Sequence, residues 1–387
     1  MSGRKPSPRL GRDAASLRSV ADLAGVSVAT ASRVLSGTRN VDVSIAARVE
    51  AAARQLDYAG NYHHRSIRTG RAQAIGFALE TVRSGRMSPL SGYFAAIISG
   101  LDAGASDEGY ALTMFGPSQG QCATEAGLQA VRTRRVDALV VAGELHSPES
   151  LLRLQNSQAL PLVMTHPRFR APTASVSYDD VAGTRLVIEH LASLGHRRLL
   201  WLGPAHYPPS DHQTREQHFI TGVWDAGLEG LSCRYDAPTQ LSHKHEPAPE
   251  ETIVAEAALG KRLAEAPADF TAIVAYNDFA AVGALRALSA AGLSVPQDVS
   301  VAGFDNMIAT VTMPALTSVD LRFFDIGREA AALAIALSRR NSVPEGTAGH
   351  LPDPEDTRVI PPKLHVRSST GPAKDARSGR SHTIPKK

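Results

Sequence analysis

Short apolar segments alternate with helical segments through most of this chain, from Gln73 to about Thr370. The clearest apolar segments are 74–79, 110–115, 136–143, 161–166, 198–203, 271–276 and 299–304. The helical segments that alternate with them include 123–134, 148–157, 180–194, 214–227, 253–265, 278–291 and 325–340. Continuous apolar strands that alternate with helices are typical of parallel sheets covered on both faces. Because about ten strands are too many for one compact sheet, we expect two sheets in two lobes.

A purely helical region precedes this α/β region. Gly25 is expected to end a first short helix, and Ser27 can cap a second one. A third helix follows at about 43–57. The side chains expected to face inward from the three helices are Val20, Leu23, Ala24, Ala31, Val34, Leu35, Ile45, Val49, Ala52 and Leu56, with small Ala21 allowing a close crossing. Two helices joined by a glycine-containing turn predict a DNA-binding helix-turn-helix, and a plain three-helix bundle is the alternative.

The second helix of a helix-turn-helix enters the major groove and presents its outer side chains to base edges. Here those side chains are Val28, Ala29, Ser32, Arg33 and Ser36. The hydrocarbon groups of Val28 and Ala29 can contact thymine methyl groups, whereas Arg33 can read guanine or hold a phosphate.

The charge distribution supports contact with a polyanion at this end of the chain. Residues 1–71 carry twelve Arg or Lys and five Asp or Glu, a balance of +7, whereas the other 316 residues carry 29 basic and 33 acidic residues, a balance of −4. A basic region of this kind suits nucleic acid, an anionic membrane surface or plain solvation. The first 57 residues contain no Trp or Phe, which argues against a membrane-surface helix.

Several other classes of protein are not supported by the sequence. We expect no transmembrane helix, no secretory signal and no disulfide framework, since Cys122 and Cys233 are the only cysteines. These features fit a cytoplasmic protein. The chain has no Walker P-loop, G-x-G-x-x-G, G-x-S-x-G or H-E-x-x-H motif, so we expect no enzyme and no cofactor. The loop His243–Glu246 could bind a metal, but solvated histidines without paired cysteines are the simpler interpretation, and we expect no metal.

One stretch, LRSVADLAGVSVATASRVLSG (17–37), closely resembles the start of lactose-repressor (LacI/GalR) family regulators. Further motifs resemble that family in the same order along the chain: Arg65–Arg71, Asp179–Gly183, His190–Leu191, Leu194–Arg198, Asn277–Asp278, Ser300–Asn306, Pro314–Val319 and Arg367–Thr370. The resemblance covers about residues 16–370.

The resemblance implies a helix-turn-helix domain joined by a hinge to a two-lobed, periplasmic-binding-protein-like domain with two Rossmann-like parallel sheets. The boundaries we expect are a disordered arm 1–15, a DNA-binding domain 16–60, a hinge 61–72, an effector-binding and dimerisation domain 73–370, and a disordered tail 371–387. Within 73–370 we expect lobe 1 at about 73–177 and 322–340, and lobe 2 at about 178–321 and 341–370.

The resemblance also implies a homodimer, or a tetramer, on a near-palindromic double-stranded DNA operator. In such regulators the hinge wedges an apolar side chain into the minor groove, which bends the DNA. Ile67 occupies the place of the wedge, and His63 and His64 stand where relatives carry small residues. The DNA-binding residues we expect are Leu17, Ser19, Ser27, Val28, Ala29, Thr30, Ser32, Arg33, Ser36, Asn61, Ile67 and Arg68.

The small-molecule effector of such regulators, a sugar or sugar derivative in most of the family, is expected between the lobes. Asn277 and Asp305 follow strands 271–276 and 299–304, and ligands bind beyond the carboxyl ends of such strands. Asp278 is a further candidate contact, or instead a helix cap. Tyr93 and Phe94 occupy the place of a family ligand loop, where they could stack on a ligand or pack a helix start.

Two expected pocket positions depart from the family pattern. Phe219 stands where relatives often carry an Arg, with Arg215 one helical turn earlier, and His166 stands where many carry an Asp. All three are retained as candidate effector contacts, but a particular sugar specificity cannot be copied onto them. We therefore expect a ligand-responsive transcriptional regulator that acts as a repressor. The alternative is a small-molecule (sugar) binding or sensor protein that recognises no specific operator.

Overall fold

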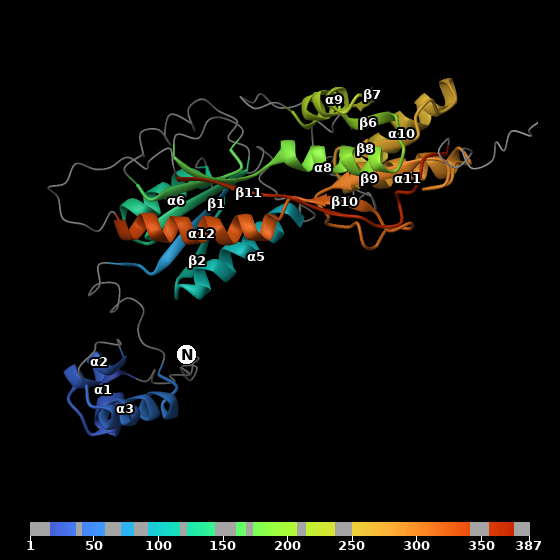
Figure 1. The fold of residues 1–387 in the computed structure, drawn as a ribbon. Coiled ribbons are helices and arrows are strands. Elements are labelled where there is room, and N and C mark those ends of the chain that lie inside the picture. The colour runs from blue at the N-terminus through green and yellow to red at the C-terminus, as the bar shows by residue number, and fades with distance from the viewer. Residues whose placement is uncertain are drawn as a thin grey trace, which may run out of the picture. The chain divides into compact units, whose positions relative to one another are not determined.

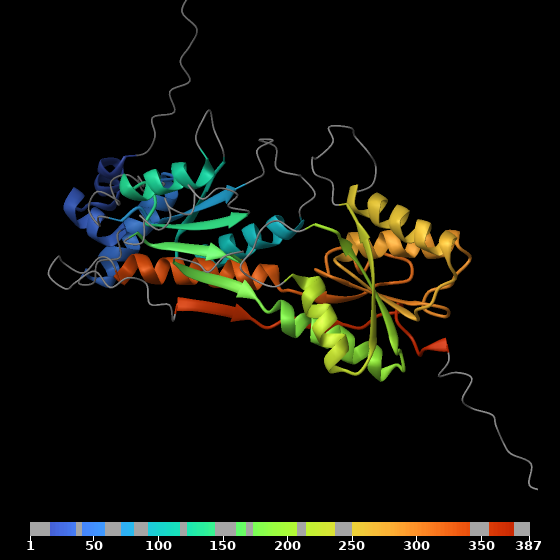
Figure 2. The same cartoon turned by 90° about the horizontal axis from the view of Figure 1, so that it is seen from above.

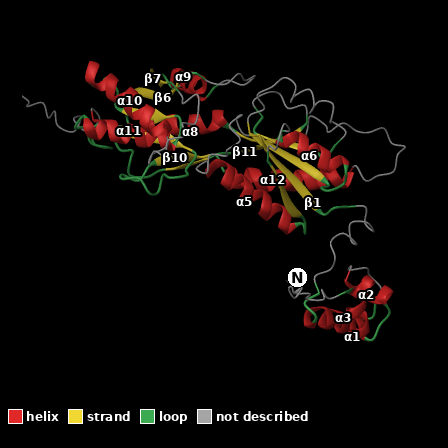
Figure 3. Cartoon of the chain, turned by 180° about the vertical axis from the view of Figure 1, so that it is seen from behind, coloured by secondary structure: helices red, strands yellow, loops and turns green. Residues whose placement is uncertain are grey.

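The computed structural model describes residues 16–35, 41–58, 71–80, 92–116, 122–143, 160–167, 173–206, 214–236, 250–340 and 356–374. The chain divides into two compact units, Met1–Gln73 and Ala74–Lys387. Figure 1 labels their elements, and Figure 3 shows that the first unit is helical whereas the second mixes helices and strands. No helix among the described residues is long and apolar enough to cross a membrane.

The described residues of the first unit form three helices, α1 (Leu17–Ala24), α2 (Val28–Leu35) and α3 (Val43–Gln55). The Ser16 hydroxyl accepts a hydrogen bond from the Ser19 amide at 3.1 Å and begins α1. Gly25 ends that helix in the left-handed conformation, with φ of 66°. The Thr30 amide donates to the Ser27 hydroxyl at 3.1 Å, as predicted for the cap of α2. This short turn, with capped helix ends on both sides, fixes the direction of α2 relative to α1.

A small apolar core holds the three helices together. It consists of the buried residues Val20, Ala21, Ala24, Ala31, Val49, Ala52 and Ala53, with partly buried Leu17, Val26, Val34, Leu35, Ile45, Leu56 and Tyr58 packed around them. The inward prediction for Leu23 was wrong, because its side chain is 47% exposed. Position 23 lies at the edge of the apolar face of α1, whose buried residues are Val20, Ala21 and Ala24.

The first sheet of the second unit has the strand order β11-β5-β4-β3-β1-β2, and all its pairs are parallel. Its strands are β1 (Ala74–Glu80), β2 (Ala111–Phe115), β3 (Ala138–Gly143), β4 (Leu162–Thr165), β5 (Ala174–Tyr178) and β11 (Thr357–Ile360). The helices that pack on this sheet are α5 (Gly92–Asp107), α6 (Ala123–Arg132) and α12 (Phe323–Arg340). Figure 2 shows α6 and α12 on opposite faces, as predicted for a parallel sheet.

The second sheet has the order β12-β10-β9-β8-β6-β7, and only the β10–β12 pair is antiparallel. Its strands are β6 (Arg198–Pro204), β7 (Glu229–Tyr235), β8 (Ala272–Ala275), β9 (Ser300–Phe304), β10 (Thr317–Asp320) and β12 (Lys363–His365). Helices α10 (Glu250–Glu265) and α11 (Asp278–Ala290) pack together, as do α8 (Asp180–Ser193) and α9 (Arg215–Asp225). Figure 2 shows the two helix pairs on opposite faces of the sheet.

Between described elements, the chain passes from one lobe to the other three times, at β5–α8, β10–α12 and β11–β12. We call these passages the crossovers. The prediction that all of 341–370 belongs to lobe 2 was wrong, because β11 pairs with β5 in the first sheet. Alternate residues of β11 are exposed, so its apolar signal is too weak to place it from sequence. The predicted helix at 148–157 lies outside the described residues.

The C-terminal prediction also needs correction, because residues 371–374 are ordered against the second sheet. The Ala373 amide donates to the Leu194 carbonyl at 2.9 Å, and buried His196 links the segment to the sheet. The His196 Nε2 atom lies 3.0 Å from the Gly371 carbonyl oxygen and 3.0 Å from the Ser300 hydroxyl. Backbone hydrogen bonds of this kind depend little on side-chain type, so composition alone did not show them.

These contacts predict that the second lobe is sensitive to acid. Burial lowers the pKa of His190 and of His196, so the folded protein favours their neutral forms. Their contribution to stability is therefore present above about pH 6.5 and is lost as the pH falls through the lowered folded values. The carboxyl group of Asp305, whose pKa burial raises to about 7, acts in the opposite direction over this range, so the histidine effect is measured as the difference in Tm between wild type and a His196 variant at pH 7 and at pH 5. His196→Asn should lower Tm at pH 7 and reduce this pH dependence in thermal melts; an unchanged slope would contradict the assignment.

A glycine-mediated helix crossing holds α5 against α12. A Cβ atom at Gly327 would overlap the carbonyl of Ile97, and one at Gly100 would overlap the carbonyl of Phe324. These glycines therefore allow backbone-to-backbone contact that no larger residue permits.

Gly327→Ala is accordingly expected to destabilise the protein by about 2 kcal/mol, since the helices must separate to admit the methyl group. Thermal or urea unfolding measures the change. Gly260→Ala in α10 is the matched control, because a Cβ atom there meets nothing within 4 Å and the substitution should raise helix stability slightly. Equal effects of the two substitutions would exclude the steric explanation.

Candidate DNA interface and effector site

The first unit exposes three of the five side chains that the sequence assigned to base contacts. Val28 is 44% exposed, and Ala29 and Arg33, which lie on the side of α2 away from the core residue Ala31, are also exposed. Leu17, Ser19, Thr30 and Ser32 are half-buried, and Ser27 is exposed at the cap. The remaining predicted contacts, Ser36, Asn61, Ile67 and Arg68, lie outside the described residues, as do His63 and His64.

In the second unit, Asp305 follows β9 in a strained conformation. Its φ is 87°, in the left-handed region that non-glycine residues rarely adopt, and its amide donates to the Val319 carbonyl at 2.8 Å. Burial raises the pKa of Asp305 to about 7, with Arg215 opposing the shift and the carboxylates Asp278, Glu251 and Asp180 adding to it. Backbone strain and a buried carboxyl group whose ionisation costs free energy are both typical of functional sites.

Arg215 is a buried cation beside this carboxylate, with 6% of its surface exposed. Its Nε atom donates to Asp180 Oδ1 at 2.7 Å, Nη1 donates to the Tyr276 carbonyl, and the guanidinium lies 4.4 Å from the centre of the Phe304 ring. Burial alone lowers the pKa of Arg215, but Asp180 above all raises it, so the guanidinium stays charged. Arg215 is thus an internal counter-ion for Asp305, and hydrogen bonds to the Asp180 carboxylate and the Tyr276 carbonyl fix its position.

An aromatic group lies on the side of the first sheet. Tyr93 contacts Phe94 and Phe323 edge to face, at centroid distances of 4.7 and 4.6 Å. Tyr178 lies 5.9 Å from Phe323, and the His166 ring stacks on Tyr178 at 3.7 Å. Burial, followed by the charge of Asp180, raises the pKa of Tyr178 well above its ordinary value. Tyr178 and Arg215 also influence each other's pKa, which places the aromatic group beside the charged residues.

Asn277 has a double role at the start of α11. Its Oδ1 atom accepts from the Ala280 amide at 2.9 Å and caps the helix, while Nδ2 donates to Glu251 at 2.7 Å. The Tyr235 hydroxyl donates to the same Glu251 carboxylate at 2.8 Å. Asn277, not Asp278, is therefore the cap of α11.

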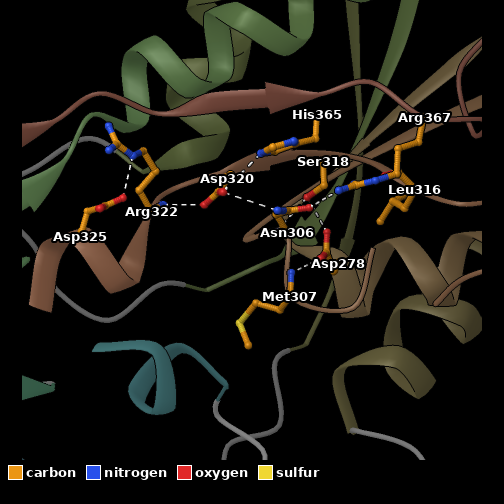
Figure 4. Close-up of polar contacts among 10 residues, drawn as sticks. All are labelled: Asp278, Asn306, Met307, Leu316, Ser318, Asp320, Arg322, Asp325, His365 and Arg367. Atoms are coloured by element: carbon orange, nitrogen blue, oxygen red, sulfur yellow. Dashed lines mark hydrogen bonds and ion pairs between the residues drawn. The ribbon is translucent and has the colours of Figure 1, made fainter. Parts of the chain in front are cut away.

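The structure gives Asp278 a role different from the predicted effector contact. Its side chain is 1% exposed and accepts from the Met307 amide at 2.7 Å, the Ile308 amide at 3.2 Å and the Ser318 hydroxyl at 2.6 Å, as Figure 4 shows in part. Burial raises the pKa of Asp278, and these hydrogen bonds oppose the shift. Asp278 holds the loop that carries Asp305, and its oxygens face the protein interior.

The prediction for Phe219 was wrong. Its side chain is completely buried and packs against Trp201, with a centroid distance of 5.6 Å. A phenylalanine on the inner face of an amphipathic helix is a core residue, and the neighbouring Arg215 reaches Asp180 from the first turn of α9.

Four residues of this region were not predicted as site residues: Tyr178, Glu251, Tyr276 and Phe323. Tyr276 directly follows β8, so the rule that ligands bind at strand ends could have found it. Glu251 enters from α10 and carries no local signal in the sequence. Among the described residues, no group of three or more His, Cys, Asp or Glu could hold a metal ion.

Comparisons with known proteins connect both parts of the chain to one family. Residues 16–61 match the family model described as bacterial regulatory proteins, lacI family, and residues 188–370 match a periplasmic binding protein-like domain. The chain is 30% identical over 366 residues to the HTH-type transcriptional regulator MalR of Streptomyces coelicolor, covering 92% of this chain and 97% of that protein. It is 26% identical to GalR of Escherichia coli K12, covering 92% and 95%.

Solved structures show the same fold. A lac repressor dimer bound to operator and an anti-inducer superposes with a TM-score of 0.66 at 22% identity, covering 92% of this chain and 99% of that one. The regulator CelR in complex with cellobiose gives a TM-score of 0.57 at 23% identity, again covering 92% and 99%. Together, the two family-model matches and the nearly full-length similarity to MalR show that the chain belongs to the LacI family of bacterial DNA-binding transcriptional regulators.

Proposed function

We propose that this regulator binds a near-palindromic operator as a homodimer and represses transcription there. Each copy presents α2 to a major groove, with Val28 and Ala29 against thymine methyl groups and Arg33 on a guanine or a phosphate. The exposure of these three side chains on a helix held by Ala31 and Val20 supports the proposal. The described similarity to a lac repressor dimer bound to operator agrees with this assembly.

We further propose that a sugar or sugar derivative binds at Asp305 and controls operator affinity. The observation that carries this proposal is the set of groups around buried Arg215: the charges of Arg215 and Glu251 act on Asp305, Asn277 donates to Glu251, and Tyr178 interacts electrostatically with Arg215. A carboxylate accepts hydrogen bonds from adjacent hydroxyls, and aromatic faces pack on the apolar faces of a sugar ring. Structures of related regulators hold cellobiose, lactose and ribose.

Effector binding alters operator affinity only if the effector binds one arrangement of the two lobes more tightly than another. We propose that this difference reaches the DNA-binding unit through residues 61–72. In a dimer these residues connect the effector-binding parts to two DNA-binding units, which must fit the spacing of the operator half-sites. A few kcal/mol of difference in effector binding is enough to switch operator occupancy.

The relatives named above are transcriptional regulators, and we propose that this chain likewise acts in the cytoplasm without catalysing a reaction. The alternative is a sugar-binding sensor that recognises no operator. The basic balance of residues 1–71 and the exposed α2 side chains favour the operator-binding regulator.

Titration of the full-length protein with cellobiose, lactose and ribose tests the effector proposal. We expect at least one of these sugars, or a close neutral relative, to raise Tm with a saturable concentration dependence. Asp305→Ala should remove that shift. A variant that responds as the wild-type protein does would place the effector elsewhere.

A further inference from the structure

Asn306, the residue after Asp305, is the centre of a polar network that reaches the lobe crossovers (Figure 4). Its own backbone is left-handed, with φ of 52°. The Asn306 amide donates to the Ser318 hydroxyl at 3.1 Å, Oδ1 accepts from Arg367 Nη2 at 2.7 Å, and Nδ2 lies 3.5 Å from Asp320 Oδ2. The Asn306 side chain thus joins the Arg367 guanidinium, which follows β12, to the Asp320 carboxylate at the end of β10.

One partner of the Asn306 side chain lies at a crossover, and the other follows the strand that a second crossover leads into. Asp320 is the last residue of β10, immediately before the chain crosses to α12, and Arg367 follows β12, just beyond the β11–β12 passage. Asp320 also accepts from the Arg322 amide at 2.7 Å and lies 3.3 Å from His365 Nε2. Arg322 is left-handed, with φ of 58°, and its guanidinium bonds Asp325 in the first turn of α12 at 2.8 Å. The Asn306 side chain therefore contacts the β10–α12 crossover through Asp320, and through Arg367 and the Asp320–His365 pair it reaches both β12, which the β11–β12 crossover leads into, and the segment after it.

A change in the relative orientation of two lobes must be absorbed where the chain passes between them, because the sheets and helices on either side are closely packed. Left-handed residues at the ends of elements store backbone strain that such a movement can release. Asp305 and Arg322 are both of this kind, and Asn306 bridges the segments that carry them.

We propose that Asn306 is a positioning residue that couples occupation of the effector site at Asp305 to the β10–α12 and β11–β12 crossovers. This inference rests on the proposed function of the site. An amide suits the role because it accepts from Arg367 with one end and faces the Asp320 carboxylate with the other. An aspartate would repel Asp320, and an alanine would lose both contacts and fit the left-handed backbone poorly.

The variant Asn306→Gly tests the proposal, because glycine keeps the left-handed backbone and removes only the side-chain contacts. The measurements are made on the full-length protein, with its operator and the sugar that shifts wild-type Tm. Sugar affinity of the DNA-free protein is expected to change less than threefold. The factor by which that sugar alters operator affinity should fall at least tenfold. Asp320→Asn is expected to act in the same direction.

Arg134→Gly is the matched control, because Arg134 is also left-handed, with φ of 56°, but is exposed at the end of α6. It should leave both quantities unchanged. A coupling factor in Asn306→Gly within twofold of the wild-type value would overturn the proposal, as would a loss of sugar affinity as large as the loss of coupling. A wild-type protein with no sugar response would instead contradict the proposed effector.

Hydrogen exchange in the sugar-free protein gives a second test that needs no effector. The backbone amides of residues 320–326 and 361–367 are expected to exchange at least threefold faster in Asn306→Gly than in Arg134→Gly. Unchanged exchange in both segments would show that the Asn306 side chain does not hold the crossovers, and would overturn the proposal even if sugar binding were normal.

Discussion

Replacing Asp305 with asparagine is expected to abolish the effector response and, at pH 8, to stabilise the protein. The wild-type carboxylate is ionised at pH 8 although its pKa is raised to about 7, so the folded state carries the cost of that charge. Asparagine keeps the shape and removes the charge. The expected gain is about 2 kcal/mol, roughly half of what the full shift implies, because neighbouring groups can rearrange.

The pH dependence of this gain follows from the raised pKa. The carboxyl group is protonated in the folded state below about pH 7 but is ionised in the unfolded chain down to about pH 4. The stabilising effect of Asp305→Asn should therefore be greatest above pH 7 and should shrink as the pH is lowered toward 4. Urea unfolding at pH 8, 6 and 4.5 measures it. A variant that is less stable than wild type at pH 8 would show that the carboxylate is well compensated in the fold.

Arg33→Ala is expected to weaken operator binding roughly 10- to 100-fold, the loss that follows when one bidentate contact to a base is removed. Binding to random DNA should fall only a few-fold, because it depends on the number of phosphate contacts and not on base edges. Fluorescence anisotropy with both DNAs at one salt concentration gives the two ratios.

Arg54→Ala provides the charge-matched control for this prediction, since Arg54 is exposed in the last turn of α3 and not on α2. It should change operator binding less than threefold. Equal losses for Arg33→Ala on operator and on random DNA would reduce Arg33 to a phosphate contact and leave Val28 and Ala29 as the base-reading residues.

The parts of the fold that could be predicted are those with a strong periodic signal. Continuous apolar strands such as 198–203 and 299–304 identified two parallel sheets, and Ser27 and Gly25 located the helix-turn-helix through cap chemistry. The weaker strand β11 was placed in the wrong lobe, because half of its residues are exposed and its partner β5 is more than 170 residues away in sequence.

The candidate site was predicted less completely, for a related reason. Asp305 and Asn277 were found because strand ends gather ligand-binding residues, but the direction of a side chain is decided by packing. Phe219 entered the core against Trp201, and Asp278 turned to the amides of Met307 and Ile308. Glu251 could not be foreseen, because α10 brings it to Asn277 from an element with no motif of its own.

Operator recognition is tested by capturing fragmented genomic DNA from the source organism on the purified full-length protein, with and without the sugar that shifts Tm, and sequencing what binds. We expect a shared near-palindrome of about 14–20 base pairs with two half-sites, and a change in its recovery when the sugar is present. Recovery of DNA with no common sequence, lost steeply as salt is raised, would contradict operator recognition and leave a sugar-binding protein with a basic N-terminal region.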